Sequence, residues 1–168
     1  MKLQGKILIY GVPAILAAAF LIYYFSPCRR AERITGEAIA EGKKGETASA
    51  QKLLEQSISI CPGNFLALFN LGIVLSSQDR NQEAYDTLKK AEKILPEDPS
   101  TKYEIARIHA RMGRTDEAYD YILKALDLGF SDIRRLGREE DFKMFRYTPR
   151  FAEIWRKWVR INSSKAAK

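Results

Sequence analysis

Residues that could perform catalysis or bind a metal ion are few in this sequence. It contains one histidine, His109, and two cysteines, Cys28 and Cys61, too few to assemble the nitrogen and sulfur ligands of a zinc site. No glycine-rich phosphate-binding loop is present. The acidic run at residues 139–141 is better explained as the negatively charged first turn of a helix than as a metal site. We therefore predict no enzyme activity, no catalytic or metal-binding residue, no cofactor and no small-molecule substrate.

A sequence repeat indicates how the chain folds. The stretch EAYD occurs at Glu83 and again at Glu117. A period of about 34 residues is typical of a unit of two helices, and small side chains let such helices approach closely. Three copies follow one another without insertion, at residues 31–64, 65–98 and 99–132. Small and apolar residues recur at this interval: Ala50, Ala84 and Ala118; Leu54, Leu88 and Ile122; Ser57, Ala91 and Ala125.

The middle copy carries the pattern of a known family. Its characteristic positions are Leu68, Leu71, Gly72, Leu75, Ala84, Leu88, Ala91 and Pro96. This pattern resembles the tetratricopeptide repeat, W-x2-L-G-x2-Y…A-x3-F…P, with leucine at each aromatic position. The resemblance covers 102 of the 168 residues. It implies an all-α fold, a right-handed solenoid of three helix-hairpin repeats with a C-terminal helical cap.

Individual positions add detail to this fold. Thr47, Asn81 and Thr115 are expected to be the N-caps of the second helices. His109 stands at the position of Leu75 and is expected to be a core histidine with satisfied polar atoms. In the first repeat, Glu37 and Glu41 occupy positions that are apolar in the second, so we expect this hairpin to be the least stable and the two glutamates to lie on a solvated face.

An apolar segment precedes the repeats. Residues 7–25 form 19 positions without a charge, and a helix of this length covers about 28 Å, close to the hydrocarbon thickness of a bilayer. A cleaved signal peptide is the alternative, but the segment is longer than is usual for one and its A-x-A-like site lies in its middle. We predict a transmembrane anchor at residues 1–28 of a single-pass inner (cell) membrane protein. Lys2 and Lys6 resemble the flank of bacterial signal anchors, which implies an extracytoplasmic body, whereas Arg29 and Arg30 favour the opposite orientation.

The positive charge of the chain is concentrated in its last segment. Residues 1–132 carry 17 basic and 17 acidic side chains, whereas residues 133–168 carry 11 basic and 4 acidic ones. We predict a basic helical cap and tail at residues 133–168, in which an apolar stripe covers the end of the third repeat. The stripe comprises Phe151, Ile154, Trp155, Trp158 and Val159. The candidate basic-cap residues are Arg134, Arg135, Arg150, Arg156, Lys157 and Arg160.

The basic cap suggests a second type of partner. A positive patch attracts lipid headgroups, acidic proteins and nucleic acids, and ordinary solubilising charge is the alternative explanation. Nucleic acid is the least expected of these partners because no recognised nucleic-acid motif accompanies the charge. A lipid- or polyanion-binding module is therefore the alternative function.

The resemblance also implies a binding groove. In this family the first helix of each repeat lines a concave surface, and the positions carried over are Leu66, Phe69, Asn70, Ile73, Tyr103, Glu104, Arg107 and Arg111. Only Asn70 matches the subset of the family that binds a terminal carboxylate, so we do not expect such a clamp. The set suits a segment that carries apolar anchors and an acidic residue. We predict a membrane-anchored scaffold or assembly factor of the bacterial cell envelope that binds a protein partner, a subunit of a membrane or envelope complex.

The two cysteines leave two interpretations open. Cys28 precedes the first helix of repeat one, and Cys61 lies at the end of its second helix. Antiparallel helices bring these two ends together, so a disulfide is geometrically possible. Two unrelated thiols are the alternative. A bridge would persist only in an oxidising compartment.

Overall fold

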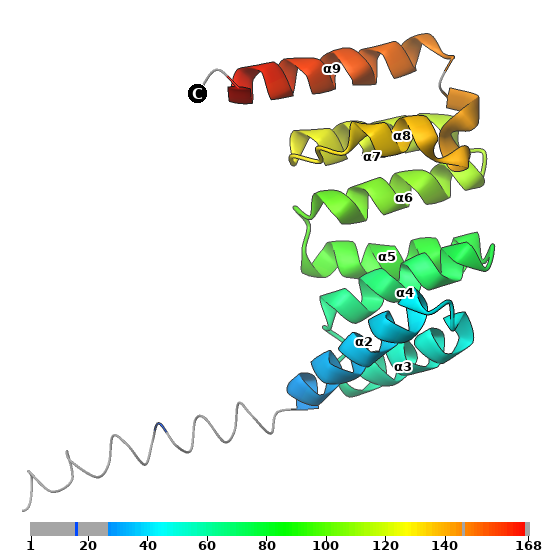
Figure 1. Cartoon of the computed structure of the whole chain (residues 1–168), viewed down its shortest axis with the longest axis vertical. Coiled ribbons are helices and arrows are strands. Elements are labelled where there is room, and N and C mark those ends of the chain that lie inside the picture. The colour runs from blue at the N-terminus through cyan, green and yellow to red at the C-terminus, as the bar shows by residue number, and fades with distance from the viewer. Residues whose placement is uncertain (1–15, 17–26, 146, 167–168) are drawn as a thin grey trace, which may run out of the picture. The chain divides into compact units, whose positions relative to one another are not determined.

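The computed structural model describes residues 16, 27–145 and 147–166, and within these ranges every regular element is a helix (Figure 1). The all-α prediction is therefore confirmed for the described chain. The predicted membrane segment at residues 7–25 lies outside the described residues except for Leu16. None of the described helices has the length and apolar character needed to cross a bilayer. The elements are α2 (Pro27–Lys43), α3 (Thr47–Ile60), α4 (Phe65–Ser77), α5 (Asn81–Ile94), α6 (Pro99–Arg111), α7 (Thr115–Asp127), α8 (Ile133–Arg138), the 3₁₀ helix η1 (Glu140–Phe145) and α9 (Pro149–Ala166).

The helices pair as the sequence repeat predicts. Each predicted copy contains two of them: α2 and α3, α4 and α5, and α6 and α7. The first helix starts at Pro27, ahead of the first copy. The chain divides into two compact units, residues 1–67 and residues 68–168, which are described separately below. The right-handed sense of the array stays a prediction.

The turn inside each repeat is a Schellman motif. Gly45, Asp79 and Gly113 occupy the same position in the three copies, and each has a positive φ, of 88°, 60° and 71° respectively. In the second repeat the Arg80 N–H donates to the carbonyl oxygen of Leu75 at 3.1 Å, and the other two turns contain the equivalent bond. This six-to-one bond and the left-handed residue before it are the defining features of the motif. Asp79 therefore holds a conformation that glycine adopts in the other two repeats.

The predicted N-caps are wrong. Thr47, Asn81 and Thr115 are the first residues inside α3, α5 and α7, and the residues before them cap these helices without a side-chain hydrogen bond. The physical reason is the Schellman turn. Its backbone hydrogen bonds shorten the connection between the two helices of a repeat. The second helix therefore begins at the threonine or asparagine itself, one residue earlier than if that residue were its N-cap.

In the first unit, buried hydroxyl groups connect α2 to α3. The hydroxyl oxygens of Thr35 and Ser57 lie 2.8 Å apart, and both side chains are completely buried. The Asn64 amide nitrogen donates to both oxygens at 3.0 Å, and its carbonyl oxygen accepts the Ala67 N–H at 3.1 Å. Every polar atom of this cluster thus has a partner, which is the condition under which a buried polar group stabilises a fold.

A disulfide closes the same unit. Cys28 and Cys61 are bonded, with their Cα atoms 5.0 Å apart, and the bridge joins the first turn of α2 to the residue that follows α3. The two cysteines are 33 residues apart, and a loop of this size is stabilised by about 4 kcal/mol in the chain-entropy model. The disulfide therefore stabilises the first repeat, which is the repeat that the sequence predicts to be the least stable. Glu37 is exposed, as predicted for a solvated face, whereas Glu41 is half-buried and pairs with Lys44 at 2.8 Å.

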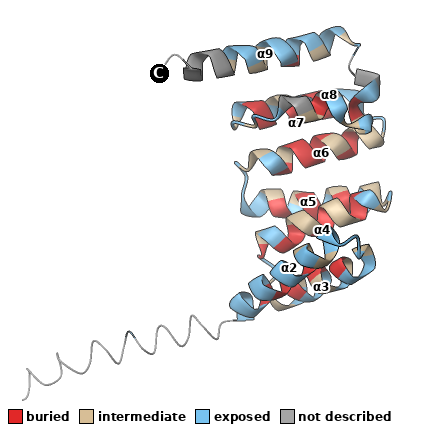
Figure 2. Ribbon diagram, in the orientation of Figure 1, coloured by how far each residue is buried: buried red, intermediate tan, exposed pale blue. Residues whose placement is uncertain are grey.

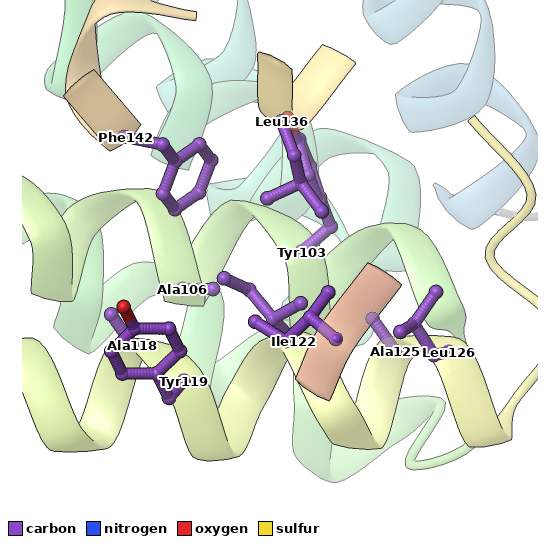
Figure 3. Packing of buried hydrophobic residues seen from close by; sticks show 10 residues of the cluster. Tyr103, Ala106, Ala118, Tyr119, Ile122, Ala125, Leu126, Leu136 and Phe142 are labelled. Carbon is purple, nitrogen blue, oxygen red and sulfur yellow. The ribbon is translucent and has the colours of Figure 1, made fainter. Parts of the chain in front are cut away.

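In the second unit, the core joins α6 and α7 to the cap. Tyr103 and Tyr119 are buried, together with Leu136 of α8, Phe142 of η1 and Ile154 of α9 (Figure 3). The predicted apolar stripe of α9 divides at this point. Ile154 is buried and Phe151 and Trp158 pack against the core, whereas Trp155 and Val159 are 46% and 42% exposed. Figure 2 shows the contrast between the buried faces of α6 and α7 and the largely exposed α9.

The cap keeps the register of the repeats. Helix α8 begins at Ile133, exactly where a further copy would place the equivalent of Pro99, the first residue of α6. Helix α9 begins at Pro149, which is in the same way equivalent to Thr115, the first residue of α7. Residues 133–166 are therefore a degenerate fourth copy. In place of one continuous first helix it has α8 and η1. Its sequence therefore lacks the apolar spacing that marks the first helix of the other copies.

Gly72 provides a test of helix packing in the second unit. A Cβ at this position would lie 2.5 Å from Cγ of the fully buried Leu88, so we expect Gly72→Ala to lower the free energy of unfolding by about 1–3 kcal/mol. Gly36→Ala is the matched control, because no heavy atom lies within 4 Å of its added Cβ, and here we expect a gain of about 0.5–1 kcal/mol. Urea unfolding followed by circular dichroism measures both. Equal shifts in the two variants would contradict the assignment of close packing at Gly72.

Candidate binding groove

The α4 side of the predicted groove combines exposed and half-buried apolar residues. Leu66, in the first unit, is 47% exposed. Phe69, Asn70 and Ile73, in the second unit, are half-buried. Helix α4 is apolar on average and has no clearly polar face. Its sequence alone therefore does not indicate which face is exposed. Leu66 is the groove residue that is most accessible to a partner.

Tyr103 does not line a surface. Its side chain is fully buried, stacks on Phe130 with ring centroids 4.3 Å apart, and lies 5.8 Å from the ring of Phe142. The guanidinium of Arg135 lies over the same ring, 4.9 Å from its centroid. Burial raises the pKa of Tyr103 above its usual value. Tyr103 is therefore a core residue, because the segment after α7 covers the face of α6 that would otherwise be open.

The other groove residues of α6 form a network of ion pairs. Arg107 contacts Glu104 at 2.8 Å, Glu139 at 2.6 Å and Asp141 at 2.9 Å. Arg111 contacts the same Asp141 at 3.2 Å. The carboxylates of Glu139 and Asp141 come from the segment after α8. We call Arg107 and Arg111 the arginine face of α6.

Two further contacts extend this network. Arg111 pairs with the turn residue Asp79 at 3.1 Å and donates to the Ser76 hydroxyl at 2.9 Å. Arg135 reaches Glu104 at 3.5 Å and Glu139 at 2.9 Å. The network thus connects the end of α4, the length of α6 and the start of the cap within the second unit.

The charges of the network are mutually dependent. Burial raises the pKa of Glu104, and the nearby Arg107 and Arg135 partly counteract this effect. Burial alone would lower the pKa of Arg107, but the carboxylates of Glu104 and Glu139 raise it above its usual range. Arg107 therefore keeps its charge beside these carboxylates, and the planar fork of an arginine can bind a carboxylate at two points.

Three of the six predicted basic-cap residues, Arg135, Arg150 and Lys157, form ion pairs within the described chain. Arg150 pairs with Asp116 and, at 3.6 Å, with Asp120, while Lys157 pairs with Asp127 at 2.7 Å. These aspartates all belong to α7, so the two basic residues fasten α9 to α7. Arg135 belongs to the network around α6. Arg156 donates to the Ala152 carbonyl at 3.2 Å, Arg160 is exposed, and the side chain of Arg134 lies outside the described residues.

His109 is buried without hydrogen bonds. It is 4% exposed, and among the described residues neither ring nitrogen has a partner. Its ring centroid lies 5.1 Å from that of Tyr85 and 5.4 Å from that of Tyr121. The prediction of a core position holds, but the expected hydrogen bonds are missing. Among the described residues, no group of three or more His, Cys, Asp or Glu side chains could hold a metal ion.

Comparisons with known proteins agree with this geometry. Two models of the tetratricopeptide repeat match, one at residues 53–86 and one at residues 99–128. A crystal structure of MamA has a TM-score of 0.68, with 17% identity over 100% of this chain and 99% of MamA. A MamA point mutant is 28% identical over 59% of this chain and 72% of its own, with a TM-score of 0.55. No curated protein matches the sequence.

Two further solved structures have a similar fold. The Yersinia enterocolitica type III secretion chaperone SycD, in complex with a peptide of the translocator YopD, has a TM-score of 0.58 and 14% identity over 80% of this chain and 93% of SycD. An O-GlcNAc transferase of Thermobaculum terrenum matches with a TM-score of 0.59 and 18% identity, over 61% of this chain but 20% of the enzyme.

The matched repeats and the observed hairpins define the class: the described chain is an all-α array of helix pairs. More narrowly, residues 53–86 and 99–128 resemble tetratricopeptide repeats, and the fold of the chain is similar to that of MamA.

The buried histidine generates a prediction about pH. Burial lowers the pKa of His109 below its usual value of 6.5, and the lysines 89 and 124 and Arg114 act in the same direction against Glu117. The unfolded chain therefore binds the proton more readily than the folded one. The stability that depends on neutral His109 is complete above about pH 6.5 and is lost as the pH falls toward the lower folded-state pKa.

We expect this loss to disappear in His109→Leu, which places the residue of the equivalent position, Leu75, in the same core. The free energy of unfolding, measured between about pH 7.5 and 5.5, should fall with pH in the native protein and fall less in the variant. An identical pH dependence in both proteins would show that protonation of His109 does not limit stability.

Proposed function

We propose that the protein is a membrane-anchored scaffold or assembly factor that holds a segment of a partner protein of the bacterial cell envelope in the groove of its repeats. The observation that carries this proposal is the exposure of Leu66, at 47%, at a position where the family binds partners. An apolar side chain of this size, held on a rigid helix, is a suitable anchor for a partner. The complex of SycD with a translocator peptide supports the proposal by analogy of fold.

The chemistry of the predicted groove positions describes the segment that they would accept. In the second unit, the half-buried Phe69 and Ile73 favour an apolar side chain. The arginine face of α6 favours a carboxylate. The partner segment would therefore combine an apolar anchor with acidic residues.

Binding of lipid or another polyanion through the basic cap is the second candidate. Trp155 and Arg156 help to line an open cavity beside α9, and Arg156 and Arg160 are exposed. An exposed tryptophan beside arginines is typical of a helix that contacts a lipid surface. However, Arg150 and Lys157 are paired with α7, so fewer charges are available than the sequence suggests.

We also propose that the repeats lie outside the cytoplasm, and that the segment at residues 7–25 anchors them to the membrane. The support for this location is the bridge between Cys28 and Cys61, because cytoplasmic thiols are kept reduced. Thiol alkylation of the protein in native membranes, before and after reduction, tests the proposal. We expect labelling of both cysteines only after reduction, and labelling of both beforehand would contradict an extracytoplasmic body.

The groove itself is tested at Leu66. A photo-crosslinking residue at this position, in native membranes, should capture the partner for identification by mass spectrometry. Leu66→Asp should weaken partner binding about tenfold or more, since a buried leucine contributes roughly 1.5–3 kcal/mol. Leu95→Asp is the matched control, because Leu95 is 46% exposed but lies after α5, away from the predicted groove positions.

The outcome separates the two candidate functions. Equal loss of partner binding in Leu66→Asp and Leu95→Asp would argue against a specific groove. Loss in Arg156→Glu with full retention in Leu66→Asp would favour the basic cap instead.

A further inference from the structure

The arginine face of α6 already has an occupant, which is part of the same chain. Residues 139–142 follow α8 and run onto this face, where their acidic side chains meet the arginines. These four residues have the sequence Glu-Glu-Asp-Phe. The first and third are carboxylates directed at Arg107 and Arg111, and the fourth is an aromatic anchor.

The polar contacts are those expected of a bound peptide. Glu139 reaches Arg107 at 2.6 Å, and Asp141 contacts Arg107 at 2.9 Å and Arg111 at 3.2 Å. The side chains of Glu139 and Asp141 are 18% and 15% exposed, so most water has been excluded from these ion pairs. The intervening Glu140 differs. Its side chain is 76% exposed and pairs with its neighbour Lys143.

The apolar contact is equally well defined. Phe142 is completely buried, and Figure 3 shows its ring directed toward α6, the helix that carries Tyr103 and Ala106. The ring centroids of Phe142 and Tyr103 are 5.8 Å apart. The segment therefore satisfies both requirements that the sequence predicts for a groove ligand, an apolar anchor and acidic residues.

The local structure of this segment is weak. Residues 140–142 lie in η1, a 3₁₀ helix of six residues, and Glu139 connects η1 to α8, which also has six residues. Short 3₁₀ helices have poor hydrogen-bond geometry and depend on their surroundings. The conformation of residues 139–142 thus depends on α6 more than on its own backbone.

We propose that residues 139–142 are an intramolecular ligand of the arginine face, and that a partner segment with two carboxylates at alternate positions, followed by an aromatic residue, displaces them. This inference rests on the proposed binding function and adds the chemistry of the partner and its regulation. The exchange re-forms the same ion pairs and the same aromatic contact. The tethered segment has an effective concentration of about millimolar, so it weakens the apparent affinity for any competing segment.

The test uses the full-length protein in detergent and a synthetic peptide of residues 135–145 carrying a fluorescent label. Glu139→Gln/Asp141→Asn weakens the internal ligand without altering the arginine face. We expect this variant to bind the peptide about tenfold or more tightly than the native protein. Glu140→Gln is the matched control and should bind like the native protein, because the exposed Glu140 pairs with Lys143 of its own segment. A peptide with the two corresponding substitutions should bind neither protein.

Hydrogen exchange provides an independent readout on the native protein. Excess unlabelled peptide should speed exchange at residues 139–145 while α6 and α7 keep their protection. If saturating peptide leaves this segment as protected as α6, residues 139–142 are a fixed cap and the inference is wrong. The same conclusion follows if the double variant keeps α6 and α7 protected yet binds the peptide no better than the native protein.

Two other outcomes are distinguished by the same experiments. A mass that rises with protein concentration, through exchange of the segment between two copies, would overturn the assignment to a separate partner. Displacement of the segment by peptide, with no partner captured at Leu66, would support the internal ligand and count against the proposed function. Capture of a partner at Leu66 without displacement of the segment would support the proposed function and count against the internal ligand.

Discussion

A single left-handed residue between two helices is the constraint on which each repeat depends. Gly45, Asp79 and Gly113 reverse the chain within one turn, and backbone hydrogen bonds close that turn. The two helices then run antiparallel and close together, so glycine or alanine is needed where they meet, as at Gly72 against Leu88. The same reversal brings the beginning of α2 beside the end of α3, where Cys28 and Cys61 can bond. Hairpin geometry, core composition and the disulfide all follow from this one backbone conformation.

The repeat could be predicted from sequence because it rests on local spacing, whereas the cap and the groove rest on contacts between distant segments. The period predicts two helices in each of the three copies, and the structure has them as α2 to α7. The division of the fourth copy into α8 and η1 removes the helical pattern, so its register becomes visible only once α9 is seen to begin at Pro149. The repeat pattern predicts Tyr103 at the groove from its position in the helix, but the burial of Tyr103 depends on Phe142, which lies beyond the third repeat in the sequence.

The charge of residues 133–168 also depends on contacts between distant segments. The sequence places the entire net charge of +7 in residues 133–168, which suggests a cationic surface. In the structure, Arg150 and Lys157 meet aspartates of α7, and Arg135 meets Glu104 and Glu139. A segment that looks basic in isolation is thus fastened to an acidic face of the preceding repeat. Counting charges identifies the segment, but only the fold identifies which of these charges remain available.

The disulfide of the first repeat also determines how tension would travel along the chain. A pull on the segment before Cys28 does not have to pass through α2 and α3. It crosses the sulfur–sulfur bond and reaches Cys61, the residue immediately after α3. The residues enclosed by the bridge are thereby shielded from the load, together with the buried cluster of Thr35 and Ser57. With the bridge closed, the first unit behaves under tension as a covalent link between the N-terminal segment and α4; with the bridge open, the hairpin would carry the full force.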